Sequence, residues 1–157
     1  NLPPGDPLIG QGLNTRCFLN KAALHDVRRY IDGFRGLRAG LEELVTFGAI
    51  VGVPPDLVSE QRRAMIDFSD AVQRDGYYDT VLRDPRMVEA INFNSGQAPE
   101  QFNLTPSCTT ATGMAFPPRR IVEVVQGFGE NGVLQSICSD DFTGAMDAII
   151  GAIVRRR

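Results

Sequence analysis

The sequence predicts an α/β protein built on an open, parallel sheet, and three observations lead to this fold class. An apolar run over residues 45–53 lacks polar alternation and ends at Pro54-Pro55, as expected of a strand buried on both faces. A second apolar run, residues 133–138, has the length of a strand. Amphipathic helical segments precede and follow it, and this helix–strand–helix order is typical of parallel sheets.

The segment before the first strand is predicted to hold one helix. Pro, Gly and Asn are frequent in residues 1–12, and we expect an irregular lead-in over residues 1–20. A helix over residues 24–37 then follows, because apolar positions recur at helical spacing. These positions are Leu24, Val27, Ile31, Phe34 and Leu37. Gly36 and Gly40 help to end this helix.

The stretch between the two strands contains further helical segments. Residues 59–74 are predicted to form one helix, with Met65, Phe68 and Val72 along one side. Asp75-Gly76 ends it, and residues 77–91 offer one or two short helical pieces interrupted at Asp84-Pro85. Residues 96–113 have no consistent period around Cys108. A loop of this length is usually functional or held by a covalent link.

The C-terminal part of the sequence completes the predicted unit. Pro117-Pro118 begins a helix over residues 118–128, and Gly and Asn interrupt the pattern at residues 129–132. After the strand at 133–138, a second helix covers residues 142–154. Its apolar positions are Phe142, Met146, Ile149, Ile150 and Ile153.

Ser139, Asp140 and Asp141 are the candidate site residues, because ligands of parallel sheets bind beyond the C-terminal ends of strands. The two carboxylates are suited to bind a cation or to act as acid and base. The favoured alternative is helix capping, since Ser-Asp-Asp directly precedes an apolar helix. Nucleophilic catalysis by Cys138 or Ser139 requires a base, and His25 is the only imidazole in the sequence.

Composition limits the function further. A net charge of -3 argues against general affinity for nucleic acid or anionic membranes, and no apolar run is long enough to span a bilayer. The sequence contains no glycine-rich nucleotide or phosphate motif, so no cofactor is expected. Three scattered cysteines, Cys17, Cys108 and Cys138, do not suggest a zinc site. At this point reduced thiols in a cytosolic protein and one disulfide in an exported protein both remain open.

Several sequence segments together resemble the C-terminal half of bacterial von Willebrand factor type A-like proteins. These are exported or lipoprotein-like chains of proteobacteria, including myxobacteria. The segments lie at residues 47–55, 106–108, 116–121, 128–132 and 136–142, and the similarity extends from about Arg16 onward. The resemblance implies a doubly wound, Rossmann-like sheet whose last two strands are residues 45–53 and 133–138. Residues 56–113 then form a long, partly helical insertion between these strands.

The resemblance implies a single domain, or the C-terminal part of one, over residues 1–157. Since the chain begins at Asn1 without an initiator Met, we expect a processed or truncated product. Type A domains bind a metal through an Asp-x-Ser-x-Ser loop, which this sequence lacks, so no metal ligand can be assigned. The expected function is non-enzymatic protein binding or adhesion outside the cytoplasm. The alternatives are a small α/β hydrolase or transferase using Ser139, Asp140 and Asp141, and a purely structural fragment.

The expected extracytoplasmic location favours a disulfide. Cys108 lies in the long irregular segment and Cys138 ends the last strand, so we expect these two residues to be bonded. The bond would tie the irregular segment to the sheet. Cys17 would remain as the odd thiol.

Overall fold

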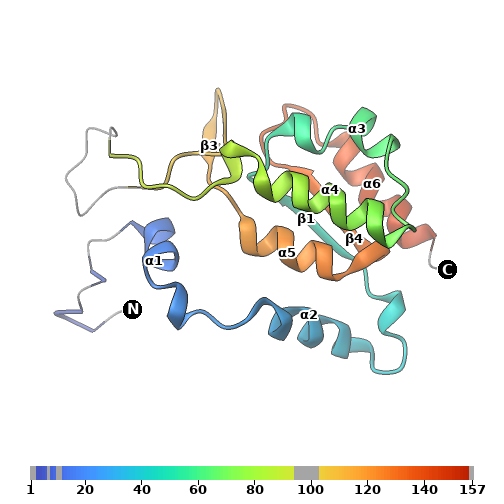
Figure 1. Ribbon diagram of the computed structural model, residues 1–157, viewed down its shortest axis with the longest axis horizontal. Coiled ribbons are helices and arrows are strands. Elements are labelled where there is room, and N and C mark those ends of the chain that lie inside the picture. The colour runs from blue at the N-terminus through green and yellow to red at the C-terminus, as the bar shows by residue number, and fades with distance from the viewer. Residues whose placement is uncertain (1–2, 7, 10–11, 94–102, 156–157) are drawn as a thin grey trace.

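The structure, a computed structural model, describes all residues except 1–2, 7, 10–11, 94–102 and 156–157. It is a mixed α/β fold whose elements surround a small central sheet (Figure 1). The helices are α1 (Leu13–Leu19), α2 (Val27–Arg35), α3 (Glu60–Ala64), α4 (Ala71–Arg83), α5 (Arg119–Gly127) and α6 (Thr143–Val154). The strands are β1 (Phe47–Val51), β2 (Cys108–Thr110), β3 (Gly113–Ala115) and β4 (Gly132–Ser136).

The two predicted strands are parallel neighbours, as the sequence indicated. β1 pairs with β4 in a register that places Phe47 opposite Gly132 and Val51 opposite Ser136. The Ile137 amide donates to the Val51 carbonyl at 2.8 Å, which extends the pairing past the end of β4. Within the described residues, the other strand pairing is the short antiparallel hairpin of β2 and β3.

Helices cover both faces of the β1–β4 sheet. α5 packs on one face with α4 beside it, and α6 packs on the other. Two glycines allow these close approaches: a Cβ on Gly132 would lie 2.1 Å from the Val125 carbonyl oxygen of α5. A Cβ on Gly48 would lie 3.0 Å from the Ile149 side chain of α6.

α2 packs on the outer side of α5 (Figure 1). The Arg35 guanidinium donates to the Gly127 carbonyl at 2.8 Å, and Ile31 fills the space above Gly127. Three aromatic rings contact one another in a row: Phe34 of α2 is tilted against Phe47 of β1 at a centroid distance of 5.4 Å, and Phe47 stacks on Phe128 after α5 at 5.1 Å. These rings connect α2 to the beginning of β1.

The core lies between the sheet and the pair α4–α5. Its fully buried side chains include Val53, Tyr78, Val81, Met87, Val122, Val125 and Leu134. Burial raises the pKa of Tyr77 to about 12, and its hydroxyl donates to the Leu57 carbonyl at 3.2 Å. The Tyr78 hydroxyl donates to the Gly132 carbonyl at 3.4 Å. These bonds offset the cost of burying two polar atoms.

The prediction of a single helix over residues 59–74 is wrong, because residues 65–70 are not helical and separate α3 from α4. The Asp70 side chain accepts hydrogen bonds from the Val72 and Gln73 amides and so begins α4. α4 then continues through Asp75-Gly76, where an end was predicted. A glycine costs about 1 kcal/mol inside a helix, and the burial of Tyr77, Tyr78 and Val81 offsets this cost.

Two other local predictions need correction. α1 lies inside the segment 1–20 that was expected to be irregular. The segment 96–113, also expected to be irregular, contains β2 and the beginning of β3, while residues 96–102 lie outside the described part. The Ser107 hydroxyl donates to the Gly52 carbonyl and so anchors the hairpin to the chain after β1, while the Ser107 amide donates to the Ala115 carbonyl at 2.9 Å within the hairpin.

The predicted disulfide between Cys108 and Cys138 is confirmed, with a Cα–Cα distance of 6.1 Å. It joins the first residue of β2 to the chain just after β4. Cys17 is a free, exposed cysteine. A disulfide is typical of proteins in oxidising compartments.

Candidate functional site

The predicted site residues Ser139, Asp140 and Asp141 form the turn between β4 and α6. The Ser139 hydroxyl donates to the Asp141 carbonyl at 2.8 Å, and Asp140 is exposed. The Asp141 carboxylate accepts from the Thr143 amide at 2.8 Å and from its hydroxyl at 2.7 Å. These hydrogen bonds lower the pKa of Asp141. The favoured capping interpretation therefore applies to Asp141. This residue lies one position before Phe142, which is the N-cap residue of α6.

We expect Asp141→Ala to lower the thermal midpoint and Asp140→Ala to leave it unchanged, because only Asp141 bonds to the first turn of α6. Since folding lowers the pKa of Asp141, its contribution is complete above the unfolded-state pKa and is lost as the pH falls through the folded-state pKa. The midpoint difference between wild type and Asp141→Ala should thus shrink in acid. Thermal unfolding monitored by circular dichroism tests this, and equal effects of the two substitutions would contradict it.

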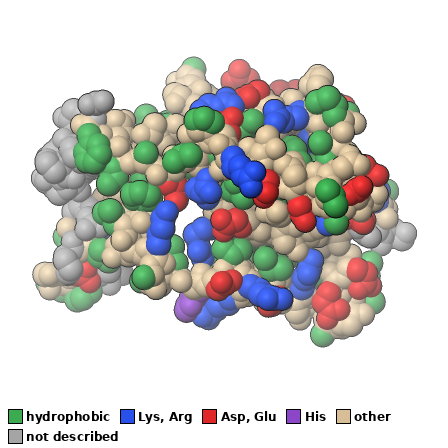
Figure 2. Space-filling model, viewed as in Figure 1, with side chains coloured by type: hydrophobic (Ala, Val, Ile, Leu, Met, Phe, Trp, Pro, Cys, Tyr) green, Lys and Arg blue, Asp and Glu red, His purple; other side chains and the backbone are tan. Residues whose placement is uncertain are grey.

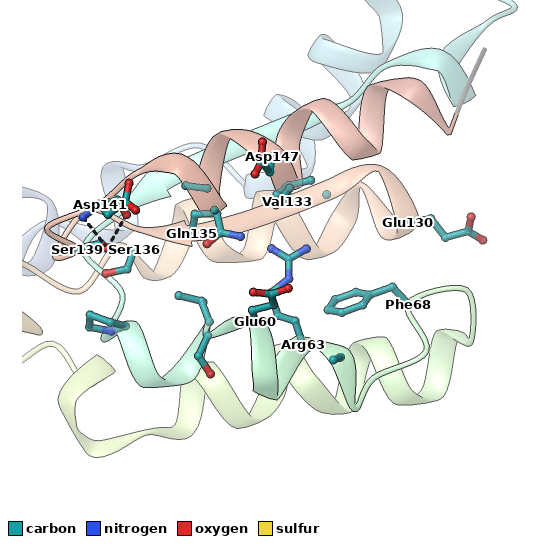
Figure 3. A pocket seen from close by; sticks show the side chains of 18 of the residues that line it. Glu60, Arg63, Phe68, Glu130, Val133, Gln135, Ser136, Ser139, Asp141 and Asp147 are labelled. Atoms are coloured by element: carbon teal, nitrogen blue, oxygen red, sulfur yellow. Dashed lines mark hydrogen bonds between the residues drawn. The ribbon is translucent and has the colours of Figure 1, made fainter.

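A groove runs beside the same turn, between α3 and α6 (Figure 3). Its volume is about 1020 Å³. The floor is the outer edge of β4, with Val133, Gln135 and Ser136, and the turn residues Ser139 and Asp141 lie at one end. This groove was not predictable from the sequence, because one wall is α3, and no local pattern reveals where the segment between the two strands lies.

Arg63 is the central basic side chain of the groove. Its guanidinium donates to the Leu134 carbonyl at 3.3 Å and lies 5.5 Å from the centre of the Phe68 ring. Glu60 and Arg63 project between the two walls in Figure 3. Among the residues that the structure describes, neither Glu60 nor Asp147 forms an ion pair.

In the groove, neither Ser136 nor Ser139 donates its hydroxyl to a basic side chain. The Ser136 hydroxyl donates to the Val53 carbonyl at 2.5 Å, and the Ser139 hydroxyl is bonded within its own turn. His25 is not one of the residues that line the groove. Its ring contacts the Arg29 guanidinium at 2.9 Å. Within the described ranges, no group of three or more His, Cys, Asp or Glu residues is placed to hold a metal ion.

The two edges of the parallel sheet differ. At the outer edge of β4, the carbonyls of Gly132 and Leu134 accept hydrogen bonds from Tyr78 and Arg63. At the outer edge of β1, alternation along a parallel strand directs the backbone groups of Gly48 and Ile50 away from β4. No described residue contributes a hydrogen bond to this edge. The sheet is thus covered at β4 and open at β1.

Apolar side chains are exposed on α6 and on α2, each of which has one side chain in contact with β1. On α6, the groove residues Gly144, Asp147, Ala148 and Arg155 occupy the side toward β4. The opposite side, toward β1, carries an exposed apolar stripe made of Phe142, Met146, Ile150 and Ile153. On α2, Tyr30, Phe34 and Leu37 are exposed, and the Phe34 ring contacts Phe47 at the start of β1. We call these residues, with Gly48 and Ile50, the β1-edge surface.

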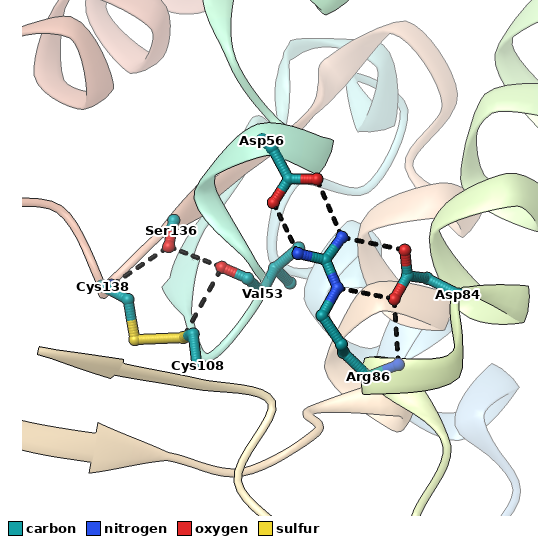
Figure 4. A network of polar contacts seen from close by, with 7 residues as sticks. All are labelled: Val53, Asp56, Asp84, Arg86, Cys108, Ser136 and Cys138. Atoms are coloured by element: carbon teal, nitrogen blue, oxygen red, sulfur yellow. Dashed lines mark hydrogen bonds and ion pairs between the residues drawn. A yellow bond between two sulfur atoms is a disulfide. The ribbon is translucent and has the colours of Figure 1, made fainter.

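An ion-pair network unforeseen from the sequence lies after β1 (Figure 4). Arg86 binds both carboxylate oxygens of Asp56, at 2.7 and 2.8 Å, and both of Asp84, each at 2.9 Å. Its hydrogen bonds lower the pKa values of Asp56 and Asp84. Asp56 and Asp84 are far apart in sequence and carry no motif. The network fixes the end of α4 to the strand end, which indicates a structural role.

Charges of both signs are interspersed over the face in Figure 2, without a large field of either sign. No helix in the described part of the chain has the length and apolar character needed to cross a membrane. No family model matches the chain, and no curated protein and no solved structure matches it.

Proposed function

We propose that this chain is a non-enzymatic protein-binding domain that receives an extended segment of a partner polypeptide at the β1-edge surface. The observation that carries the proposal is the open edge of β1, bordered by exposed apolar side chains on both faces of the sheet. Contiguous exposed apolar surface commonly marks protein interaction sites. An unpaired strand edge also exposes a row of backbone donors and acceptors.

The occupant follows from the chemistry of this surface. The Gly48 and Ile50 backbone groups require a partner with matching groups at strand spacing, which an extended segment supplies. The stripe on α6 is exposed on one face of the sheet, and Phe34 of α2 contacts Phe47 of β1 on the other. They favour apolar side chains on both faces of the added strand, as buried parallel strands have.

The wider setting of the proposal is an exported protein with a von Willebrand factor type A-like, doubly wound sheet. The Cys108–Cys138 disulfide supports an extracytoplasmic location. The parallel pairing of β1 with β4 is the pairing that this resemblance implied for the last two strands.

The alternative of a hydrolase or transferase using Ser139, Asp140 and Asp141 has less support. Ser139 and Asp141 are engaged in the turn and the helix start, and the Ser139 hydroxyl donates to a backbone carbonyl rather than to a base. A binding role requires only the exposed surface. We therefore propose adhesion or protein binding rather than catalysis.

Peptides selected from a phage-displayed library of linear peptides on the immobilised chain provide the test. We expect fluorescein-labelled selected peptides to carry alternating apolar residues and to lose affinity about tenfold on Ile150→Lys, because a charge would enter an apolar contact. Val72→Lys is the matched control, since Val72 is exposed on α4 away from this surface. Fluorescence anisotropy measures the affinities.

Two outcomes would contradict the proposal. The first is equal binding to wild type and Ile150→Lys. The second is a stable homodimer in light scattering that Ile150→Lys dissociates, because the occupant would then be a second copy of the chain.

A further inference from the structure

We propose that the groove between α3 and α6 is a second, separate site that binds a basic peptide segment of a protein ligand. It lies along the covered edge of the sheet, on the side of α6 opposite the apolar stripe. This proposal does not depend on binding at the β1-edge surface. Each site can be tested while the other is intact.

Charge identifies the ligand class. The groove is lined by four carboxylates and two guanidinium groups, which are Glu60, Glu130, Asp141, Asp147, Arg63 and Arg155. Glu60 lies on the α3 wall and Asp147 on the α6 wall, and no described cation pairs with either. A Lys or Arg side chain of a ligand could therefore pair with either carboxylate.

Arg63 does not remove this preference for cations. Its guanidinium is held by the Leu134 carbonyl and the Phe68 ring, where it covers the edge of β4. It forms no ion pair with a carboxylate of the described residues. Because Arg63 occupies the Leu134 carbonyl, we expect the ligand to bind through its side chains rather than as an added strand.

The shape of the groove fits a peptide better than a small ion. Its volume is about 1020 Å³, and it is open between α3 and α6. Among the described residues, no group of side chains in it is placed to bind a metal ion. Apolar contact is available from Ala64, Phe68 and Ala148, which line the groove and are at least partly exposed. The alkyl chains of Lys or Arg can pack on such residues while their charged ends reach Glu60 and Asp147.

Three fluorescein-labelled peptides that alternate Ala with Lys, Glu or Gln are suitable probes. We expect only the Lys peptide to bind saturably, with an affinity that falls as salt increases. The double substitution Glu60→Gln/Asp147→Asn should weaken it about tenfold. Asp32→Asn/Asp75→Asn removes the same net charge from exposed helix positions outside the groove, and should change affinity less than about twofold.

Ile150→Ser should leave binding of the Lys peptide unchanged, which separates this site from the β1-edge surface. Equal binding of the Gln or Glu peptide would overturn the proposal. So would an equal loss in the two double variants, because binding would then reflect net charge alone. Absence of saturable binding by the Lys peptide would also overturn it.

Discussion

Replacing both Cys108 and Cys138 by Ser should lower the free energy of unfolding by about 3–4 kcal/mol. The two residues are separated by 30 positions, and cross-linking a loop of this length restricts the unfolded chain by about that amount in the chain-entropy model. The bond also anchors the β2–β3 hairpin beside the end of β4. Urea denaturation of the oxidised protein and the double variant measures the difference.

Cys17→Ser is the control for this experiment. Cys17 is exposed and unbonded, so its substitution should change stability by less than about 0.5 kcal/mol. If the double variant unfolds at the same urea concentration as wild type, the disulfide does not constrain the chain as described.

Gly132→Ala should destabilise the protein by about 3 kcal/mol. The added Cβ would lie 2.1 Å from the Val125 carbonyl oxygen, and the atom in the way belongs to the backbone of α5. Relief requires α5 to move away from β4, which disturbs a close-packed core. The free energy of unfolding from urea denaturation gives the value.

Gly76→Ala is the matched substitution with the opposite expected sign. Gly76 lies inside α4, and a Cβ there would meet no atom within 4 Å. Alanine should therefore stabilise by about 0.5–1 kcal/mol through its helix propensity. If both substitutions changed stability in the same direction, the close contact between Gly132 and α5 would not have the effect we assign to it.

The parallel pair of strands was predictable because both segments are continuous apolar runs next to helix and turn signals. Residues 45–53 lack polar alternation, and the Ser-Asp-Asp sequence after residue 138 signals the start of α6. The break between α3 and α4 was not predictable from periodicity. It depends on the Asp70 carboxylate capping a helix whose Gly76 is compensated by tertiary burial of Tyr77 and Tyr78.

The candidate site was predictable only in part. The position of Ser139, Asp140 and Asp141 beyond a strand follows from local pattern, but the groove beside them needs α3 to lie against β4. That position depends on the long-range contacts of Arg63 with Leu134 and of Tyr78 with Gly132. The open edge of β1 was also not predictable, because the sequence of a strand does not determine how many neighbouring strands pair with it.

Amide hydrogen exchange of the Gly48 and Ile50 backbone tests the central claim most directly. NMR can follow both amides in the free protein and with a saturating selected peptide. Because both amides belong to the open edge, the account predicts rapid exchange in the free protein and strong slowing in the complex, with Ala49 little changed. Unchanged exchange at Gly48 and Ile50 in a peptide-saturated protein would contradict binding at the edge of β1.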